Sequence, residues 1–585
     1  MQQIQQLLTE HLDIWTAAET EKKSGRGRAS GSASKVYGIQ KLRGLILDLA
    51  VRGKLVLQDA NDEPASALLM RIQAEKAKLS YEGKPKKEKP LIPIKDDEKP
   101  FELPNQWEWV HLPDVTEYKV GKTPSTKSNV YWTDSEDGIN WVSIADLSHY
   151  GVVTETTKKV TDLAQKEVFK SEPVPVGTIL MSFKLTLGKV SILEVPAFHN
   201  EAIISIYPSE AIDKGYLFKI LPARANEGES KSAIKGNTLN SESIAALLLP
   251  LPPLAEQLRI VAKVDELMAL CDQLEQQHSN AAEAHEKLVE HLLGTLAQAQ
   301  NTQDFNSQWQ RIYTNFDTLF TTEFSIDALK QTLLQLAVMG KLVQQDPTDE
   351  PASELVKRIQ AEKAKLVAEG KLKKEKPLAP IAEDEKPFEL PKGWEWQKLT
   401  EVILKITDGE HLSPKKTTEG MPLVSAKDVK ADGVNLSETN FVKYEDGISF
   451  RQRCNPEYDD ILICSRGTIG RCTLVNTNEI FCLMGSVILL KTSRVLNANY
   501  LARYLQTPIA QSWMTGASSA TAVSALYLKD VAKLVVPVPP LAEQHRIVAK
   551  VDELMVVCDQ LKTRIQEASQ HQQQLAGVLV AQAVN

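Results

Sequence analysis

Three short segments of the 585-residue chain carry residue types that could do chemistry. Asn455–Tyr458 (NPEY) approaches the NPPY turn that holds a flipped adenine for methylation, but glutamate replaces the second proline and no glycine-rich cofactor loop accompanies it. Pro113–Lys119 (PDVTEYK) has the residue types of a PD...ExK nuclease, but its carboxylates lie only three residues apart, too close to meet across a hairpin and share a metal. Gly121–Thr123 (GKT) lacks the first glycine of a phosphate-binding loop. The sequence therefore predicts no catalytic centre.

The cysteines give no sign of a metal site or a disulfide framework. The chain has six, with no CxxC pair. Four of them are spaced by 10, 8 and 10 residues, which is typical of thiols in a strand core: Cys454, Cys464, Cys472 and Cys482. We expect reduced thiols and no bound metal.

Composition and charge bound the remaining possibilities. With 42% hydrophobic and 25% charged residues the chain should fold, and its length calls for several domains. No run of about 18 apolar residues could span a membrane, and acidic residues occur where a secretory signal would be basic and apolar, so we expect a cytoplasmic protein without a membrane partner. The net charge of 68 − 76 = −8 offers no general attraction for nucleic acid. Any DNA binding must depend on local geometry.

The elements that could position binding residues belong to an internal repeat. Leu49–Trp109 returns as Leu336–Trp396 with 46 identities in 61 positions, and Pro250–Leu274 returns as Pro537–Leu561 with 21 in 25. Both pairs are displaced by 287 positions. The chain is therefore two tandem copies of one unit.

Identity is confined to part of each copy. Residues 110–249 (insert 1) and 397–536 (insert 2) share little beyond a local echo, TILMSFKLTLGK at 178–189 and DILICSRGTIGR at 460–471. We call the repeated parts around them the frame. Neutral drift after a duplication would erode frame and insert alike. The pattern therefore favours a frame that does the same job twice and inserts that each recognise something different.

Each frame ends in a predicted long helix. After the two PPLAEQ turns, apolar residues recur with alternating spacings of four and three, as in a coiled coil, and the pattern extends to Leu292 and Leu579. Two such seams in one chain indicate intramolecular pairing, although a coiled coil that only forms a homodimer is the alternative. The seam residues expected to pair or to dock partners are Ile260, Val264, Leu267, Leu274, Ile547, Val551, Leu554 and Leu561.

The inserts read as mixed α/β modules. Short apolar strands alternate with Gly, Pro and Asp turn residues, and about 140 residues suffice for an independent core. The fold class expected is α+β, with two α/β domains separated by a pair of long antiparallel coiled-coil helices and related by a pseudo-twofold axis.

Two divergent inserts, each opened by FELPxxWEW and closed by PPLAEQxRIVAKVDEL and a heptad helix, resemble the specificity subunits of type I restriction-modification systems. The resemblance covers nearly the whole chain. It implies the following domains: helical frame with flexible linker 1–104, target recognition domain 105–250, conserved helix 251–300, second frame and linker 301–391, second target recognition domain 392–537, and C-terminal conserved helix 538–585.

The resemblance also implies a function without catalysis. Such a subunit recognises a bipartite double-stranded DNA target and directs adenine methylation and ATP-dependent restriction by its partners, which are two modification and two restriction subunits. S-adenosylmethionine, ATP and magnesium would be bound by those partners, and this chain would hold no cofactor. The helix expected at Arg358–Lys365 should link frame to insert, so four residues added there should lengthen the unread gap by one or two base pairs.

Within the inserts we expect DNA contacts from glycine-bounded loops that carry basic, amide and hydroxyl side chains, since Arg and Lys suit guanine edges and phosphates. The candidates in insert 1 are Lys122, Thr123, Ser125, Lys184, Thr186, Lys189, Lys235 and Asn237. Those in insert 2 are His411, Lys415, Lys416, Arg466, Thr468, Arg471, Ser518 and Thr521. Trp132 and Trp141 are expected in the core rather than as stacking platforms. The competing hypothesis is a non-catalytic scaffold whose inserts bind two protein or carbohydrate ligands.

Overall fold

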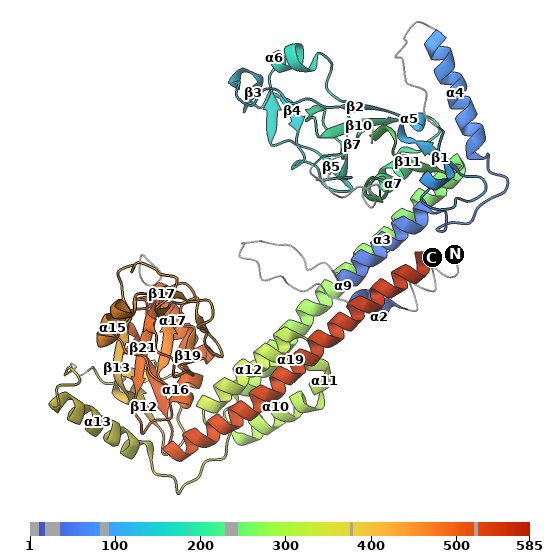
Figure 1. Ribbon diagram of the computed structural model, residues 1–585. Coiled ribbons are helices and arrows are strands. Elements are labelled where there is room, and N and C mark those ends of the chain that lie inside the picture. Colours follow the sequence, from blue (N-terminus) through green and yellow to red (C-terminus); the bar gives the residue numbers. More distant parts are fainter. Residues whose placement is uncertain are drawn as a thin grey trace. The chain divides into compact units, whose positions relative to one another are not determined.

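A computed structural model describes residues 11–17, 36–81, 93–184, 186–227, 244–374, 378–519 and 525–584. The chain divides into two compact units, of which unit 1 comprises residues 1–281 and 568–585 and unit 2 comprises residues 282–567. Each unit holds one insert, and the two long helices α9 (Leu254–Gln298) and α19 (Leu541–Val584) each contribute to both units (Figure 1). No helix in the described ranges is long and apolar enough to cross a membrane.

Insert 1 is built on a five-stranded sheet in the order β2-β10-β7-β8-β5. Its central strand β7 is buried on both faces because Ile179 and Met181 point into the core shared with the frame, whereas Leu180 points into a second core. That second core lies between this sheet and a four-stranded sheet, β3-β6-β4-β9, which contains the parallel pair β4 and β9. The strands are β2 (Thr116–Val120), β3 (Trp132–Thr133), β4 (Ile139–Val142), β5 (Gly151–Val153), β6 (Lys158–Val160), β7 (Ile179–Ser182), β8 (Val190–Leu193), β9 (Ala197–His199) and β10 (Ile203–Pro208).

Insert 2 has the same core topology despite its different sequence. Its main sheet runs β13-β21-β18-β19, and a smaller sheet, β17-β14-β20, again contains a parallel pair, β14 and β20. Ile461 and Ile463 of β18 face the frame core, whereas Leu462 and Cys464 face the second core. The elements are β13 (Ile403–Asp408), β14 (Met421–Val424), β17 (Asn440–Val442), α15 (Tyr444–Arg453), β18 (Ile461–Cys464), β19 (Cys472–Leu474), β20 (Cys482–Leu483) and β21 (Val487–Thr492).

The frame closes each insert with a short two-stranded sheet. In unit 1, β1 (Glu108–His111) pairs antiparallel with β11 (Leu248–Leu251), and in unit 2, β12 (Glu395–Lys398) pairs antiparallel with β22 (Val535–Val538). A helix of each insert, α7 (Lys214–Glu227) or α16 (Ala498–Leu505), is tied to this sheet: the Tyr216 hydroxyl donates to the Pro250 carbonyl and the Tyr500 hydroxyl to the Pro537 carbonyl, at 2.9 and 2.8 Å. The two ends of each insert therefore leave the frame side by side.

The first half of each long helix packs with the frame helix that precedes its insert. In unit 1, α3 (Tyr37–Val51) shares a hydrophobic cluster with Ile260 and Val264 of α9. Arg43 of α3 lies 2.6 Å from Asp272 of α9. In unit 2, α12 (Glu323–Val338) and α19 are joined at the repeat-equivalent positions, Lys330 and Asp559.

The first part of each expected seam therefore packs against α3 or α12, and the expected spacing of buried residues holds over only part of each long helix. The expected seam residues from Ile260 to Leu274 and from Ile547 to Leu561 are buried or half-buried. Further along, Leu288 is 47% exposed and Leu575 is 51% exposed. The buried positions shift by one residue, to Val289 and Ala576. The continuous heptad alternation, which would have placed Leu288 and Leu575 in the seam, is thus wrong there, because the buried face of an α-helix drifts by about 20° per heptad relative to a 3.5-residue repeat.

Further helices complete each unit. In unit 2 the described helices include α10 (Thr302–Thr314) and α11 (Phe316–Leu319), and in unit 1 α2 (Leu12–Ala17) places the fully buried Trp15 in the core. The helices α4 (Ala65–Tyr81) and α13 (Ala352–Ala368) occupy equivalent places in the chain. All six cysteines are buried and unpaired by disulfides, and burial raises the pKa of Cys472 to about 12, so these thiols are inert core residues.

Candidate nucleic-acid interface

In insert 1, three loops converge at one edge of the main sheet. Strands β2 and β7 end there, and β8 and β10 begin there, because each neighbouring pair is antiparallel. The loops are held together by the backbone, since Gly121 N donates to Ile203 O at 3.1 Å and Phe183 N to Ala202 O at 2.9 Å. We call residues 121–125, 183–184, 186–189 and 199–202 loop edge 1.

Insert 2 forms the corresponding edge with unrelated residues. Strands β13 and β18 end beside the starts of β19 and β21. Ser465 N donates to Ser486 O at 2.9 Å, and Gly485 N donates to Glu410 O at 2.7 Å. We call residues 409–417, 465–471 and 484–486 loop edge 2. Two different loop sets are thus presented by one sheet topology.

The local sequence echo marks the same hairpin in both edges, and it separates two kinds of basic residue. Lys184 and Arg466 stand at equivalent positions of the loop, the latter exposed, and the next hydroxyl residues, Thr186 and Thr468, are exposed as well. Lys184 is half-buried, with its Nζ 5.3 Å from the ring centroid of Phe183, so Arg466 is the more accessible of the two basic side chains.

The later basic residue of each hairpin has a structural role instead. Lys189 Nζ donates to Ile144 O, and an Arg471 guanidinium nitrogen donates to Val429 O, both at 3.3 Å. Each is preceded by a glycine with positive φ, +67° at Gly188 and +81° at Gly470, which turns the chain back into the sheet. Lys189 and Arg471 therefore support the loops rather than extend from them.

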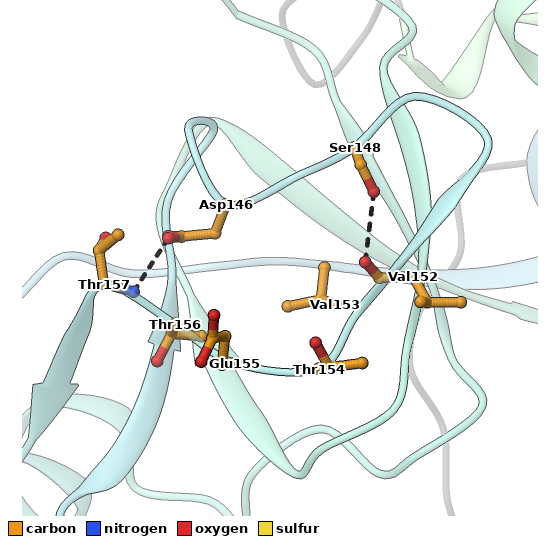
Figure 2. A pocket seen from close by; sticks show the side chains of 8 residues that line it. All are labelled: Asp146, Ser148, Val152, Val153, Thr154, Glu155, Thr156 and Thr157. Carbon is orange, nitrogen blue, oxygen red and sulfur yellow. Dashed lines mark hydrogen bonds between the residues drawn. The ribbon is translucent and has the colours of Figure 1, made fainter. Parts of the chain in front are cut away.

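The two accepting carbonyls lie in or directly after equivalent turns: Ile144 is inside the turn 143–146, and Val429 directly follows the turn 425–428. Ser143 and Ser425 donate through backbone N and Oγ to Asp146 and Asp428, respectively, three residues further on. Burial alone would raise the pKa of Asp146, but hydrogen bonds from Ser143 and Thr157 outweigh it and lower the pKa. Asp146 also lines an open hollow of about 480 Å³ (Figure 2). The ionised carboxylate fixes the turn behind loop edge 1.

The first loop of edge 1 is braced at several points. Lys122 Nζ donates to Val168 O at 3.0 Å and to Phe169 O at 3.3 Å, and the Thr123 hydroxyl donates to Glu201. Ser125 is exposed, and its carbonyl accepts from Trp132 Nε1. Trp132 and Trp141 meet edge-on, with ring centroids 4.9 Å apart, and Trp141 is only 5% exposed, so they pack the insert as expected.

The first loop of edge 2 is anchored by charge. His411 Nε2 lies 2.9 Å from Asp408 Oδ2, and Arg453 pairs with the same carboxylate. Lys415 and Lys416 further along the loop are exposed. The basic side chains therefore gather on a loop whose base is rigid.

Other sequence candidates lie elsewhere. Ser518 is 3% exposed, and its hydroxyl donates to Thr515 O at 2.7 Å, so burial leaves it no surface for a DNA contact. Lys235, Asn237 and Thr521 lie outside the described residues.

Two residues beside the loop edges were not among the candidates. Lys127 is exposed in the same run as Ser125, and the rule that selected basic and hydroxyl residues would also have selected it. Arg453 lies in α15, 45 positions from its partner Asp408, and the local sequence does not predict that contact.

Comparison with known proteins agrees with this two-domain arrangement. The family model described as type I restriction modification DNA specificity domain matches residues 104–284 and again 391–569. This chain belongs to that family. Its relatives include the EcoEI and EcoAI specificity subunits of Escherichia coli type I restriction enzymes, each 38% identical over 100% of both chains. A crystal structure of the HsdS subunit from Thermoanaerobacter tengcongensis aligns with 83% of this chain and 98% of its own, at 18% identity and a TM-score of 0.38.

Both specificity domains contain the same buried clasp between the frame segment that precedes the insert and the long helix. Trp107 Nε1 donates to Glu256 Oε2, and Trp394 Nε1 donates to Glu543 Oε2, each at 2.9 Å. Burial raises the pKa of each glutamate, and the tryptophan donor partly offsets that rise. In neither carboxyl does the other oxygen have a hydrogen-bond partner among the described residues. The indole is therefore the principal support of a buried acid.

A second repeated contact flanks the clasp. Arg259 pairs with Asp62 in unit 1, at 2.5 Å, and Arg546 pairs with Asp349 in unit 2, at 2.6 Å. Each long helix of the specificity domains is thus fixed within its first two turns to two parts of the frame, one of which directly precedes the strand that opens the insert.

Replacing Trp394 with Phe should lower the free energy of unfolding of unit 2 by about 1–3 kcal/mol, because it leaves a buried carboxyl without its donor. A raised folded pKa means that this carboxyl costs stability as pH rises through that pKa, so loss of the indole should destabilise more at pH 8 than at pH 5. Thermal melts at both pH values would measure this. Trp107→Phe is the matched variant for unit 1, and equal melts for wild type and both variants would contradict the clasp.

Proposed function

We propose that this chain is the DNA-recognition subunit of a type I restriction-modification complex and that each insert reads one half of a bipartite target. The observation that carries the proposal is the pair of loop edges: one sheet topology presents two different sets of basic and hydroxyl side chains within a repeated frame. A single domain that reads a few base pairs, at about 1–3 kcal/mol each, discriminates poorly against a genome, and two domains multiply the discrimination.

The long helices would space the two inserts as an antiparallel pair. Ala576 and Leu579, near the end of α19, share the core of unit 1 with the start of α9. Val289 and Leu292, near the end of α9, share a core of unit 2 with α12 and the start of α19. These two pairs are repeat-equivalent, displaced by 287. The end of each long helix thus packs near the start of the other at repeat-equivalent positions, which supports a pseudo-twofold arrangement.

Such an arrangement suits two identical partners. The repeated frame offers the same surface twice, so we propose that two modification subunits dock on it and that restriction subunits join them in the cytoplasm. Adenine methylation and ATP-dependent cleavage, together with S-adenosylmethionine, ATP and magnesium, would belong to those partners. Because the net charge is −8, DNA affinity would depend on the partners completing a clamp around the duplex.

The purified chain should neither methylate nor cleave DNA when it is given S-adenosylmethionine, magnesium and ATP. Addition of its modification subunits should produce adenine methylation at a bipartite sequence, which methylation sequencing would identify. Robust turnover by the chain alone, or a methylated sequence without two separated halves, would contradict the proposal.

Arg466→Ala should weaken binding to the mapped target by about 1–3 kcal/mol and relax one position of one half-site if the guanidinium reads a base. Its melting temperature should not change, because the side chain is exposed. Arg471→Ala is the contrasting variant, since loss of its bond to Val429 should lower the melting temperature. Lys184→Ala should act on the other half-site. Unchanged affinity and target for Arg466→Ala would remove it from the interface.

The scaffold alternative makes a different prediction about salt. Phosphate contacts release counterions, so the affinity for target duplex should fall steeply as salt concentration rises. A scaffold that binds proteins or carbohydrates would show no selective duplex binding at any salt concentration.

A further inference from the structure

Leu412 is the most exposed large hydrophobic side chain among the described residues, at 78%. It lies in the first loop of loop edge 2, directly after His411. None of the hydrophobic clusters formed by the described residues includes it. An isolated exposed leucine is common on proteins, but this one occupies the surface to which the proposed function assigns DNA.

The loop holds Leu412 outward on a rigid base. Its backbone N donates to Glu410 Oε1 at 3.0 Å, and Glu410 N donates to Leu483 O at 2.8 Å. The neighbouring His411 is tied to Asp408, and its ring lies against Gly485, where a Cβ atom would come within 2.6 Å of Nδ1. Any side chain at position 485 would displace the ring. The leucine is therefore presented by a braced turn.

The surroundings of Leu412 favour a polyanion over an apolar protein surface. Lys415 and Lys416 follow it in the same loop, and Arg466 is exposed on the neighbouring loop. That neighbouring loop lies close by, because the Ser465 hydroxyl donates to the Gly485 carbonyl. Basic side chains would hold the phosphates on either side of an apolar tip. Proteins that combine these features insert the apolar side chain between base pairs and partly unstack them.

We propose that Leu412 is a wedge that enters one base-pair step in or beside the half-site read by insert 2. The inference rests on the proposed function and deepens it, because part of the specificity would come from the ease with which that step unstacks. Pyrimidine–purine steps unstack most easily and are the chemical class of site expected there.

Insert 1 provides an internal control. Its corresponding loop follows β2 as Gly121, Lys122, Thr123 and Pro124, so the position three residues after the glycine is a buried proline in place of Leu412. The other half-site should therefore remain stacked. The proposal predicts an asymmetric distortion of a bipartite target.

The test uses the full chain in complex with its modification subunits and duplexes of the mapped target. The fluorescent base 2-aminopurine, which brightens when unstacked, is placed at successive positions of both halves but never at a methylated adenine, because a methyltransferase flips that base itself. We expect one bright position with wild type, in the half whose sequence depends on insert 2. Leu412→Ala should abolish the signal and weaken target binding roughly tenfold, whereas Leu412→Met should keep both.

Leu57→Ala is the matched control, since Leu57 is 69% exposed but lies in the frame, and it should change neither quantity. A complex that binds its target selectively without any bright position, or one in which Leu412→Ala keeps the signal, would overturn the wedge and leave the recognition function intact. A wild-type complex that does not distinguish its target from other duplexes would overturn the recognition function and the wedge together.

Discussion

Exchange of insert 1, residues 110–249, for the insert of a related chain should change one half of the recognised sequence completely and leave the other half unaltered. The physical reason is that each set of loops lies at the strand ends of the insert's own sheets, whereas the frame elements on which the inserts pack, including the β-pair and the clasp, are repeated in both copies. Methylation sequencing of the complex formed by the exchanged chain would show the new target.

The reciprocal exchange of insert 2, residues 397–536, is the control, and it should change only the opposite half. The gap between the halves should stay the same in both exchanges, because the long helices are untouched. A chain whose two halves both change, or whose target does not change, would show that the inserts do not read DNA independently.

Lengthening both long helices by one heptad should lengthen the unread gap. Seven residues inserted after Ala281 and seven after Glu567, where each helix passes from one unit to the other, add about 10.5 Å at 1.5 Å per residue. That length corresponds to about three base pairs at 3.4 Å, and a whole heptad preserves the helical register. Binding to duplexes that differ only in gap length would locate the new optimum.

We expect the best duplex to bind more weakly than the original target, since about three base pairs rotate the half-sites out of phase. An insertion of four residues in α13, within Arg358–Lys365, is the control. The sequence favoured that helix as a place to lengthen the gap. However, Lys363 Nζ donates to Thr400 O and the Ser493 hydroxyl donates to Glu362, so α13 lies against its own insert. The control should therefore keep the original gap, and an unchanged gap after the heptad insertion would show that the helices do not set the distance.

The sequence alone determined the organisation of this protein and the residue types that it presents. A displacement of 287 positions is a property of the chain, and so is the confinement of divergence to the inserts. The short echo at 178–189 and 460–471 located a loop common to both edges, because a turn that needs glycine at one point and returns to a buried strand restricts the residues on either side. The loop position that Lys184 and Arg466 share could therefore be located without a structure.

Only the tertiary structure decided which of these residues face solvent and which partner each helix takes. Lys184 and Lys189 cannot be told apart in the sequence. In the structure, however, Lys189 Nζ donates a hydrogen bond to the Ile144 carbonyl, 45 positions away. The apolar residues at the start of each heptad seam can pack against α3 or α12 as well as against another long helix. An apolar stripe on a helix must be buried, but it does not specify which element buries it. Contacts between distant positions, such as Trp394 with Glu543 and Arg453 with Asp408, depend on the tertiary fold. The spacing of residues along the sequence does not predict them.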